Sequence, residues 1–564
     1  MHTLLQLISS IAAPLGLYTL YRLLGMIQSR INSRIKDLPG PPSQHWFWGN
    51  LNEVNKGDAT VVHEKWVEEY GRTMKYQMLL GRLFTMDTKA FTMDTKALNY
   101  ILMNHKLYQK REVARYHLSR ILGKGVLVTE EDTHDLQRKI MNPAFGPSQI
   151  RELTEIFVDK SVELRDVWMT RIANTQDGVA QINVLSSLSK MTLDVIGLAG
   201  FNYKFNALKD KENGGSDELS KAFSVIFGDR DGERLRIWGI VQSMVPFLRV
   251  LPSQDPPEFK EAKETMARIG RKLLRESKEF LQGIGISDKE KGEGKEKTGN
   301  WNSSQRDLLS LLVKSNMNGG EQGQRMSDED VLAQVPTFLV AGHETTSTAT
   351  AWALFALSKN PSIQHKLREE LYTMVTDNPS MDQLNSLVYL DHVVRETLRV
   401  HAPVPISMRV AMEDDVIPLG EGFVDKKGVK RDRIWIQKGQ TIFIPILALN
   451  RDKSLWGEDS MEFKPERWDA IPSAVSSIPG VWGNMLTFLG GARACIGYRF
   501  SLVEMKSLLF ILLRSFEFEL AVPVEDIISK SGVVQRPMLK NKSKSEMERG
   551  GGSQLPLLVK LYEP

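Results

Sequence analysis

Cysteine is almost absent from this chain: one residue, Cys495, occurs among 564. One thiol cannot form an internal disulfide, and it cannot supply the several thiolates of a structural zinc site. The scarcity is typical of a reducing compartment, so we expect the bulk of the chain to face the cytosol. A lone cysteine is most often a small buried side chain, and a functional interpretation needs support from its neighbours.

An excess of charge of either sign is also lacking. Lysine and arginine total 73 against 69 acidic residues, which leaves a formal net charge of +4. So small an imbalance gives no reason to expect a nucleic acid partner. Hydrophobic residues make up 41% of the chain, which is enough for a large core and is typical of a globular protein.

Charge is missing locally near the N-terminus. No charged residue occurs from Leu4 to Tyr21, and about 18 such residues are enough to span a bilayer. Basic residues follow this run, beginning with Arg22, and do not precede it. A membrane anchor at residues 1–27, with the following domain in the cytosol, is therefore favoured over the alternative, a cleaved signal peptide.

The segment after the anchor, residues 28–45, is basic and contains Leu-Pro-Gly-Pro-Pro at 38–42. Proline fixes φ and lacks a donor, so we predict a stiff hinge. From residue 46 to 564 we predict one mainly α-helical domain, with extended segments near 74–86 and 405–445. Two polar stretches, 287–306 and 540–553, are predicted to be mobile loops of that domain.

One heptapeptide, Phe-Thr-Met-Asp-Thr-Lys-Ala, occurs twice, at 84–90 and again at 91–97. Two copies of this length cannot build a solenoid. A loop at a strand-to-helix junction could absorb the extra copy, and a recent duplication or an error in the gene model is an equal alternative. We assign the repeat no function.

The neighbours of Cys495 form the strongest motif, Phe-Leu-Gly-Gly-Ala-Arg-Ala-Cys-Ile-Gly at 488–497. A thiolate that binds a metal needs an electropositive setting, and the amides of a glycine-rich turn and the start of a helix provide one. A helical pattern does follow, from Tyr498 to Leu513. Arg493 could pair with a carboxylate of a ligand, and glycine lets the chain approach a flat ligand closely. The alternative is an inert cysteine in a glycine turn.

A second motif, Ala-Gly-His-Glu-Thr-Thr at 341–346, lies inside a helical stretch from about Ser327 to Lys359. Gly342 and Thr345 are three residues apart and share a helix face, so the missing side chain would open a groove for a diatomic ligand. Thr345 could donate to that ligand, and Glu344 could relay protons through water. Alternatively, the hydroxyl bonds back to a helix carbonyl and the carboxylate is a surface charge.

The two motifs, with Glu396-Thr-Leu-Arg399 and Pro-Glu-Arg467-Trp between them, resemble the cytochrome P-450 superfamily in type, order and spacing from Leu38 to the C-terminus. The loop at 488–497 matches every fixed position of the family's haem-binding loop. The resemblance implies a mainly α-helical prism with small β-sheets and a haem b whose iron is bound by Cys495. Thiolate ligation of haem iron favours cleavage of the O–O bond. Among the members of this superfamily, the sequence pattern looks most like that of fungal microsomal proteins.

The resemblance also implies roles for particular residues. Glu344 and Thr345, beside Gly342, become the acid–alcohol pair of oxygen activation. Glu396, Arg399 and Arg467 hold the core on the thiolate side of the haem. Contacts to haem are implied for six residues, of which the first occupies a position where the family more commonly has tryptophan: His134, Arg138, Arg409, Phe488, Gly491 and Arg493.

The implied reaction inserts one atom of O₂ into a small lipophilic substrate and reduces the other atom to water. The sequence shows no Gly-x-Gly-x-x-Gly unit in a βαβ context that would bind a nicotinamide or flavin. Electrons should therefore come from NADPH through a separate cytochrome P-450 reductase, with cytochrome b5 as a further candidate donor. We expect a single-pass protein of the endoplasmic reticulum membrane. Secondary metabolism or xenobiotic oxidation is an analogy, and the substrate stays open. The alternatives are an isomerase or dehydratase of the same fold that needs no O₂, and a haem- or sterol-binding membrane protein without turnover.

Overall fold

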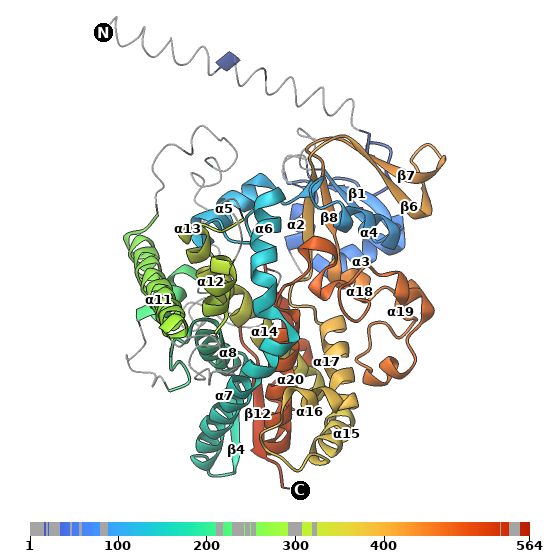
Figure 1. The fold of residues 1–564 in the computed structure, drawn as a ribbon. Coiled ribbons are helices and arrows are strands. Elements are labelled where there is room, and N and C mark those ends of the chain that lie inside the picture. The colour runs from blue at the N-terminus through green and yellow to red at the C-terminus, as the bar shows by residue number, and fades with distance from the viewer. Residues whose placement is uncertain are drawn as a thin grey trace, which may run out of the picture. The chain divides into compact units, whose positions relative to one another are not determined.

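The computed structural model describes residues 34–45, 48–55, 59–78, 88–209, 218–227, 255–290, 307–318, 324–530, 532–540 and 553–563, with a few isolated positions besides. These residues are mainly helical with small sheets, as the sequence predicts (Figure 1). The anchor predicted at residues 1–27, the start of the hinge and most of the two predicted loops lie outside them. The chain forms two compact units, and each combines separate stretches of sequence.

Unit 1 contains residues 1–111, 405–450 and 474–493. Its sheet has the strand order β1-β2-β8-β5-β3, with only β2 and β8 parallel. A separate hairpin pairs β6 with β7. The strands are β1 (Thr73–Gln77), β2 (Thr88–Thr92), β3 (Tyr108–Gln109), β5 (Ser407–Ala411), β6 (Asp415–Val424), β7 (Lys430–Ile436) and β8 (Thr441–Ile444). The helices are α2 (Leu51–Asn55), α3 (Ala59–Tyr70), α4 (Thr95–Met103) and α18 (Ile446–Asn450).

Unit 2 contains residues 112–404, 451–473 and 494–564. Two small sheets, β4-β12-β9 and β10-β11, accompany its helices. The helices are α5 (Glu112–Leu122), α6 (Glu131–Met141), α7 (Pro147–Ala173), α8 (Val184–Phe201), α9 (Glu218–Phe227), α11 (Pro257–Glu290), α12 (Leu308–Asn318), α13 (Asp328–Leu332), α14 (Gln334–Lys359), α15 (Pro361–Tyr372), α16 (Met381–Ser386), α17 (Val388–Val400), α19 (Lys453–Trp456) and α20 (Tyr498–Ser515). The strands are β4 (Val179–Asn183), β9 (Phe516–Leu520), β10 (Ile527–Lys530), β11 (Arg536–Leu539) and β12 (Pro556–Leu561).

Helix α14 lies inside unit 2, where it packs against α8, α17 and α20 (Figure 1). Nearly every side chain from Thr346 to Ser358 is buried, so the helix has no solvent face over that length. Its partner α8 is the one helix of the described residues that is long and apolar enough to cross a membrane, but 78% of it is buried within the protein. The composition of α8 is therefore that of a core helix.

Two helix boundaries differ from the predictions. The first four residues of the loop predicted at 287–306 belong to α11, which continues to Glu290, and the remaining residues of that loop lie outside the described residues. The continuous helix expected from Ser327 to Lys359 is interrupted at Ala333, between α13 and α14. Pro336 lacks the N–H that would bond to the carbonyl four residues earlier, which accounts for a break at this point.

The second copy of the heptapeptide, Phe91–Ala97, runs from the end of β2 into the start of α4. Asp94 caps α4 by accepting the Ala97 N–H at 2.9 Å. The second copy therefore spans a strand-to-helix junction, which is the kind of position that the sequence analysis considered. Residues 84–87 of the first copy lie outside the described residues.

Candidate functional site

Cys495 lies three residues before α20, in unit 2. Solvent reaches its sulfur, although many protein atoms surround the residue. Burial raises the pKa of the Cys495 thiol, while the backbone N–H of Gly497 and the positive charge of Arg138 act in the opposite direction. The electropositive setting predicted from the sequence is present, but for the free thiol it is weaker than desolvation; a bound metal ion would deprotonate the thiol outright.

Arg138 reaches this loop from α6. Its Nη1 donates to the Ala494 carbonyl at 2.5 Å and its Nε to Asn142 Oδ1 at 3.1 Å. Burial lowers the pKa of Arg138, and attraction to the Cys495 thiolate opposes that shift. His134, one turn earlier, is buried with its Nδ1 3.3 Å from Asp135 Oδ1. The structure thus brings Arg138 beside the cysteine loop, and it gives His134 a carboxylate neighbour.

A buried ion cluster centres on Glu396 of α17. Arg399 donates to both carboxylate oxygens, at 2.8 and 2.9 Å, and both side chains are fully buried. Arg467 Nε approaches the same carboxylate at 3.3 Å, and Trp468 Nε1 donates to it at 3.1 Å. The remaining donors of Arg399 reach the carbonyls of Ser460 and Glu462. The three residues expected to act together do meet, and every contact that a buried carboxylate needs is supplied.

Gly342 lies where α14 packs against α8. A Cβ at this position would lie 2.9 Å from Ile196 Cδ1 of α8. The absence of a side chain therefore allows α8 and α14 to pack closely at this position, and the role of Gly342 beside a diatomic ligand stays a prediction. The neighbouring Ala341 is the exposed residue of this turn.

The acid and the alcohol of α14 both have partners. Thr345 Oγ1 donates to the Ala341 carbonyl at 2.7 Å, which is the local bond considered as an alternative above. Glu344 forms an ion pair with Arg536 at the start of β11, and both side chains are about one-fifth exposed. No local signal in the sequence around Arg536 indicated this partner. The carboxylate is neither a free surface charge nor bonded to Thr345.

His343, between these residues in sequence, is enclosed by the α8–α14 packing. Its Nε2 lies 2.7 Å from Ser189 Oγ, and its ring meets Phe223 edge-on at 5.2 Å. Its Nδ1 is buried without a hydrogen-bond partner among the described residues. Burial, with a smaller contribution from Arg536, lowers the pKa of His343 to about 4. The imidazole is therefore neutral near pH 7.

Another buried acid, Glu504 of α20, was not predicted as a site residue. The hydroxyl of Thr346 donates to Ser501 Oγ at 3.0 Å, and neither oxygen of Glu504 has a hydrogen-bond partner among the described residues. Burial raises the pKa of Glu504 well above its ordinary value, and the nearby Thr346 hydroxyl opposes the shift. A single acid within the apolar run Phe500–Leu513 was the sequence signal for this site.

Unit 1 contains Arg409 and residues 488–493 of the cysteine loop. Arg409 is 3% exposed on β5 and donates to Ser407 Oγ and the Met408 carbonyl, both at 2.8 Å. Burial lowers the pKa of Arg409 to about 10, and no carboxylate of the described residues pairs with it. A buried cation without an acid fits a ligand carboxylate such as a haem propionate.

The glycines of the loop face protein backbone. A Cβ at Gly490 or Gly491 would collide with the carbonyl of Pro479 or Leu102, respectively. Gly491 also has a φ of +66°, which a side chain would disfavour. Phe488 is buried against Trp482, and Arg493 is partly exposed. Packing within unit 1 thus requires glycine at both positions, and the close approach of Gly491 to a ligand stays a prediction.

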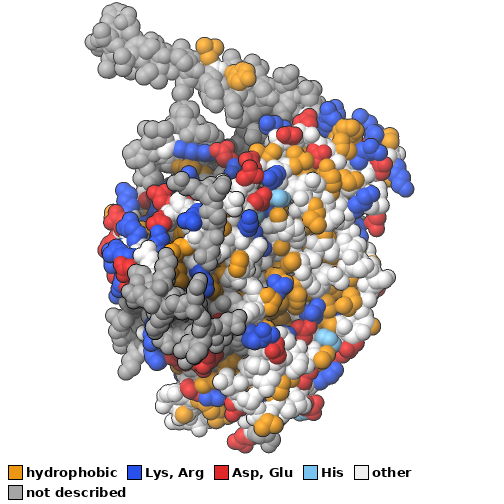
Figure 2. Space-filling model, in the orientation of Figure 1, with side chains coloured by type: hydrophobic (Ala, Val, Ile, Leu, Met, Phe, Trp, Pro, Cys, Tyr) orange, Lys and Arg blue, Asp and Glu red, His pale blue; other side chains and the backbone are white. Residues whose placement is uncertain are grey.

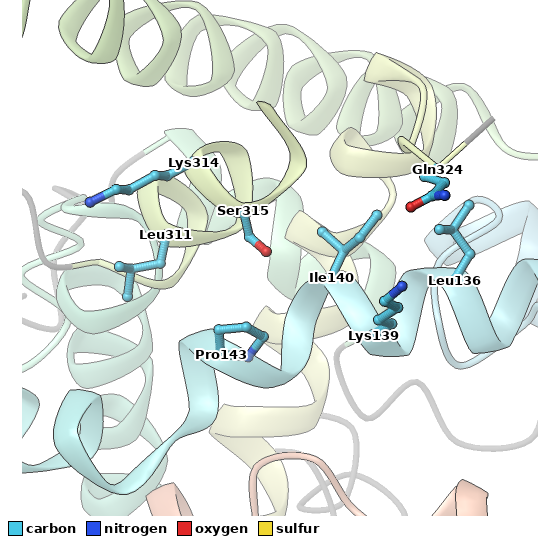
Figure 3. A pocket seen from close by; sticks show the side chains of 8 residues that line it. All are labelled: Leu136, Lys139, Ile140, Pro143, Leu311, Lys314, Ser315 and Gln324. Atoms are coloured by element: carbon cyan, nitrogen blue, oxygen red, sulfur yellow. The ribbon is translucent and has the colours of Figure 1, made fainter. Parts of the chain in front are cut away.

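These side chains fit a haem. Within unit 2, Cys495 and Ala341 are exposed to solvent. Within unit 1, the buried Arg409 has the charge that a propionate would need. A separate surface pocket of about 500 Å³ lies between α6 and α12 and is rimmed by Lys139 and Lys314 (Figure 3). None of the candidate site residues lines that pocket.

The chain is similar to known proteins over almost its whole length. The cytochrome P-450 family model matches residues 39–542. Cytochrome P-450 monooxygenase 205 of Postia placenta is 52% identical over 540 residues, which cover 95% of each chain. Cytochrome P-450 monooxygenase 128 of the same fungus is 50% identical over 553 residues, which cover 98% of this chain and 97% of the relative. Cytochrome P-450 monooxygenase claQ of Ampulloclitocybe clavipes is 32% identical over 557 residues, 97% of each chain.

A haem-thiolate protein requires a cysteine that the haem iron can reach, and Cys495 is exposed. The similarity to the curated relatives extends far beyond the motif that contains it. The chain belongs to the cytochrome P-450 family, and it is a monooxygenase of that family. Membership implies haem iron with a thiolate ligand. The predicted family and enzyme class are confirmed.

Proposed function

We propose that this protein is a membrane-anchored monooxygenase that inserts one atom of O₂ into a C–H or C=C bond of a small lipophilic substrate. For hydroxylation the balance is RH + O₂ + NADPH + H⁺ → ROH + H₂O + NADP⁺, with electrons delivered by a separate reductase. The observation that carries the proposal is the Cys495 thiol, open to solvent and adjoined by Arg138 on the carbonyl that precedes it. The endoplasmic reticulum location and a role in secondary metabolism or xenobiotic oxidation belong to the proposal as well.

Cys495 would bind the haem iron. The propionates would pair with Arg138, Arg409 and Arg493. Further contacts to the haem would come from His134, Phe488 and Gly491. The haem supplies the redox chemistry that activates O₂. Protons must come from the protein. Glu344 would relay protons through water, and the Thr345 hydroxyl, which donates to the Ala341 carbonyl in this structure, would pass them on after rotating away from that carbonyl. Arg536 is a positioning residue, because its ion pair holds the Glu344 carboxylate.

Two other functions are alternatives, an isomerase or dehydratase of the same fold and a haem- or sterol-binding membrane protein without turnover. An isomerase or dehydratase that works without O₂ has no need of an acid beside an alcohol, so Glu344 and Thr345 favour the monooxygenase. A binding protein without turnover would consume no NADPH. Both alternatives are separated from the proposal by the same assay.

The assay combines the full-length holoprotein, a fungal NADPH–cytochrome P-450 reductase and isotope-labelled O₂ with a panel of lipophilic substrates. We expect one labelled oxygen atom in the product for each NADPH consumed. Thr345→Ala should shift NADPH consumption from product to hydrogen peroxide by at least about tenfold, and Arg536→Gln should do so more weakly. Arg151→Gln, which breaks an exposed pair with Asp382, is the matched control. Product formed without O₂ and NADPH, or NADPH consumption that no substrate stimulates, would contradict the proposal.

A further inference from the structure

The β6–β7 hairpin and the segment packed on it carry a dense positive charge. Residues 34–38 and 424–435 contain seven cations against three acids, Asp37, Asp425 and Asp432. Figure 2 shows blue side chains gathered over this hairpin, at the upper right. We call it the basic hairpin surface, and its exposed cations are Arg34, Lys36, Lys426, Lys427, Lys430, Arg431 and Arg433.

The tip of the hairpin is ordered by one buried acid. Asp425 accepts the backbone N–H groups of Lys427 and Val429 at 2.9 and 3.0 Å, and Arg431 Nε donates to it at 2.9 Å. The turn therefore holds the lysines on its outside. Apolar side chains stand among them: Val424 is 59% exposed, and Val429 and Trp435 are each 44% exposed. Cations with exposed tryptophan and valine are typical of a surface that contacts lipid headgroups.

The segment 34–38 is fixed to this hairpin. The Lys426 N–H donates to the Asp37 carbonyl at 2.9 Å, and Lys427 Nζ lies 3.2 Å from Asp37 Oδ2. The guanidinium of Arg34 lies 5.1 Å from the centre of the Trp435 ring. Ile35 and Leu38 are 2% and 3% exposed, so the segment is anchored by apolar side chains too. The hairpin and residue 34 cannot separate without breaking these contacts.

Chain length then limits how far the hairpin can be from a membrane. The proposed anchor ends at residue 27, and the seven steps to residue 34 extend at most roughly 25 Å. We propose that the basic hairpin surface binds anionic phospholipid headgroups of the membrane that holds the anchor. This inference rests on the proposed anchor. Cytoplasmic leaflets carry negative lipids, and each lysine or arginine near such a surface strengthens binding about fivefold.

The test uses the full-length holoprotein in nanodiscs of phosphatidylcholine alone or with phosphatidylserine, and measures acetylation of individual lysines by mass spectrometry with an uncharged reagent. In phosphatidylserine at low salt we expect acetylation of Lys36, Lys426, Lys427 and Lys430 to slow at least about threefold, and high salt to remove the effect. The exposed Lys204 and Lys272 are internal references. Lys426→Glu combined with Lys430→Glu should abolish protection of Lys36 and Lys427, whereas Lys204→Glu with Lys272→Glu should not.

The outcomes separate the hairpin from the anchor. Retention in both kinds of nanodisc with equal acetylation would support the anchor and overturn the inference. Retention only with phosphatidylserine, lost in salt, would refute the anchor and support the hairpin surface. Protection that appears on adding the reductase, and not on adding phosphatidylserine, would show that an acidic protein binds there, and would also overturn the inference.

Discussion

Glu396 shows what a buried charge demands of its surroundings. Its carboxylate receives Arg399, Arg467, the Trp468 indole and the Lys464 backbone N–H. A buried ion pair contributes little net stability while both partners remain, because desolvation offsets the attraction. Removing one partner is different, because the other charge is then left buried and unpaired.

Glu396→Ala should therefore destabilise the haem-loaded protein by about 3–5 kcal/mol, measured by the denaturant dependence of unfolding. Asp382→Ala removes the acid of an exposed pair with Arg151 and should cost less than about 1 kcal/mol. Equal losses in the two variants would contradict the role assigned to the buried cluster.

His343 should make the fold sensitive to acid. Its pKa is about 4 when folded against an ordinary 6.5, so between these values only the unfolded chain binds the proton, and stability falls as the pH drops. Lowering the pH from 7 to 5 should cost the natural protein about 2 kcal/mol more than a His343→Gln variant. Burial lowers the pKa of His401 too, but that residue remains in both proteins. Parallel pH dependences of unfolding would refute the assignment.

At the scale of elements, helices were predictable where local chemistry decides. The helical pattern after Cys495 became α20, and the Ser327 capping box begins α13. The neighbour that a glycine packs against was not predictable, because that neighbour is distant in sequence. The contact of Gly342 with Ile196 of α8 is an example.

The two kinds of glycine contact should respond differently to alanine. In Gly342→Ala the new Cβ meets the flexible end of Ile196, so we expect a loss of about 1–2 kcal/mol that Ile196→Val relieves. In Gly490→Ala the Cβ meets the backbone carbonyl of Pro479, which cannot yield in the same way. Thermal unfolding should show the smallest loss of stability in the Gly342→Ala, Ile196→Val double variant. Gly342→Ala alone should lose more, and Gly490→Ala should lose most. A tolerated Gly490→Ala would contradict the packing described here.

At the scale of the whole molecule, the candidate residues are brought together by long-range contacts. Arg138 and Ala494 are 356 residues apart in sequence, and Glu344 meets Arg536 across 192 residues. Arg138, Glu344 and Cys495 could each be identified from a local sequence motif, because the role expected of each position requires a particular type of residue. Arg536 has no such local signature, and only the fold reveals it.

The central claim is that Cys495 is the thiolate ligand of haem. The most direct test is the absorption spectrum of the reduced, carbon-monoxide-bound full-length protein beside a Cys495→Ser variant. We predict a strongly red-shifted Soret band that is lost in the variant. Haem bound by both proteins with the same unshifted band would contradict the account, because another residue would then hold the iron.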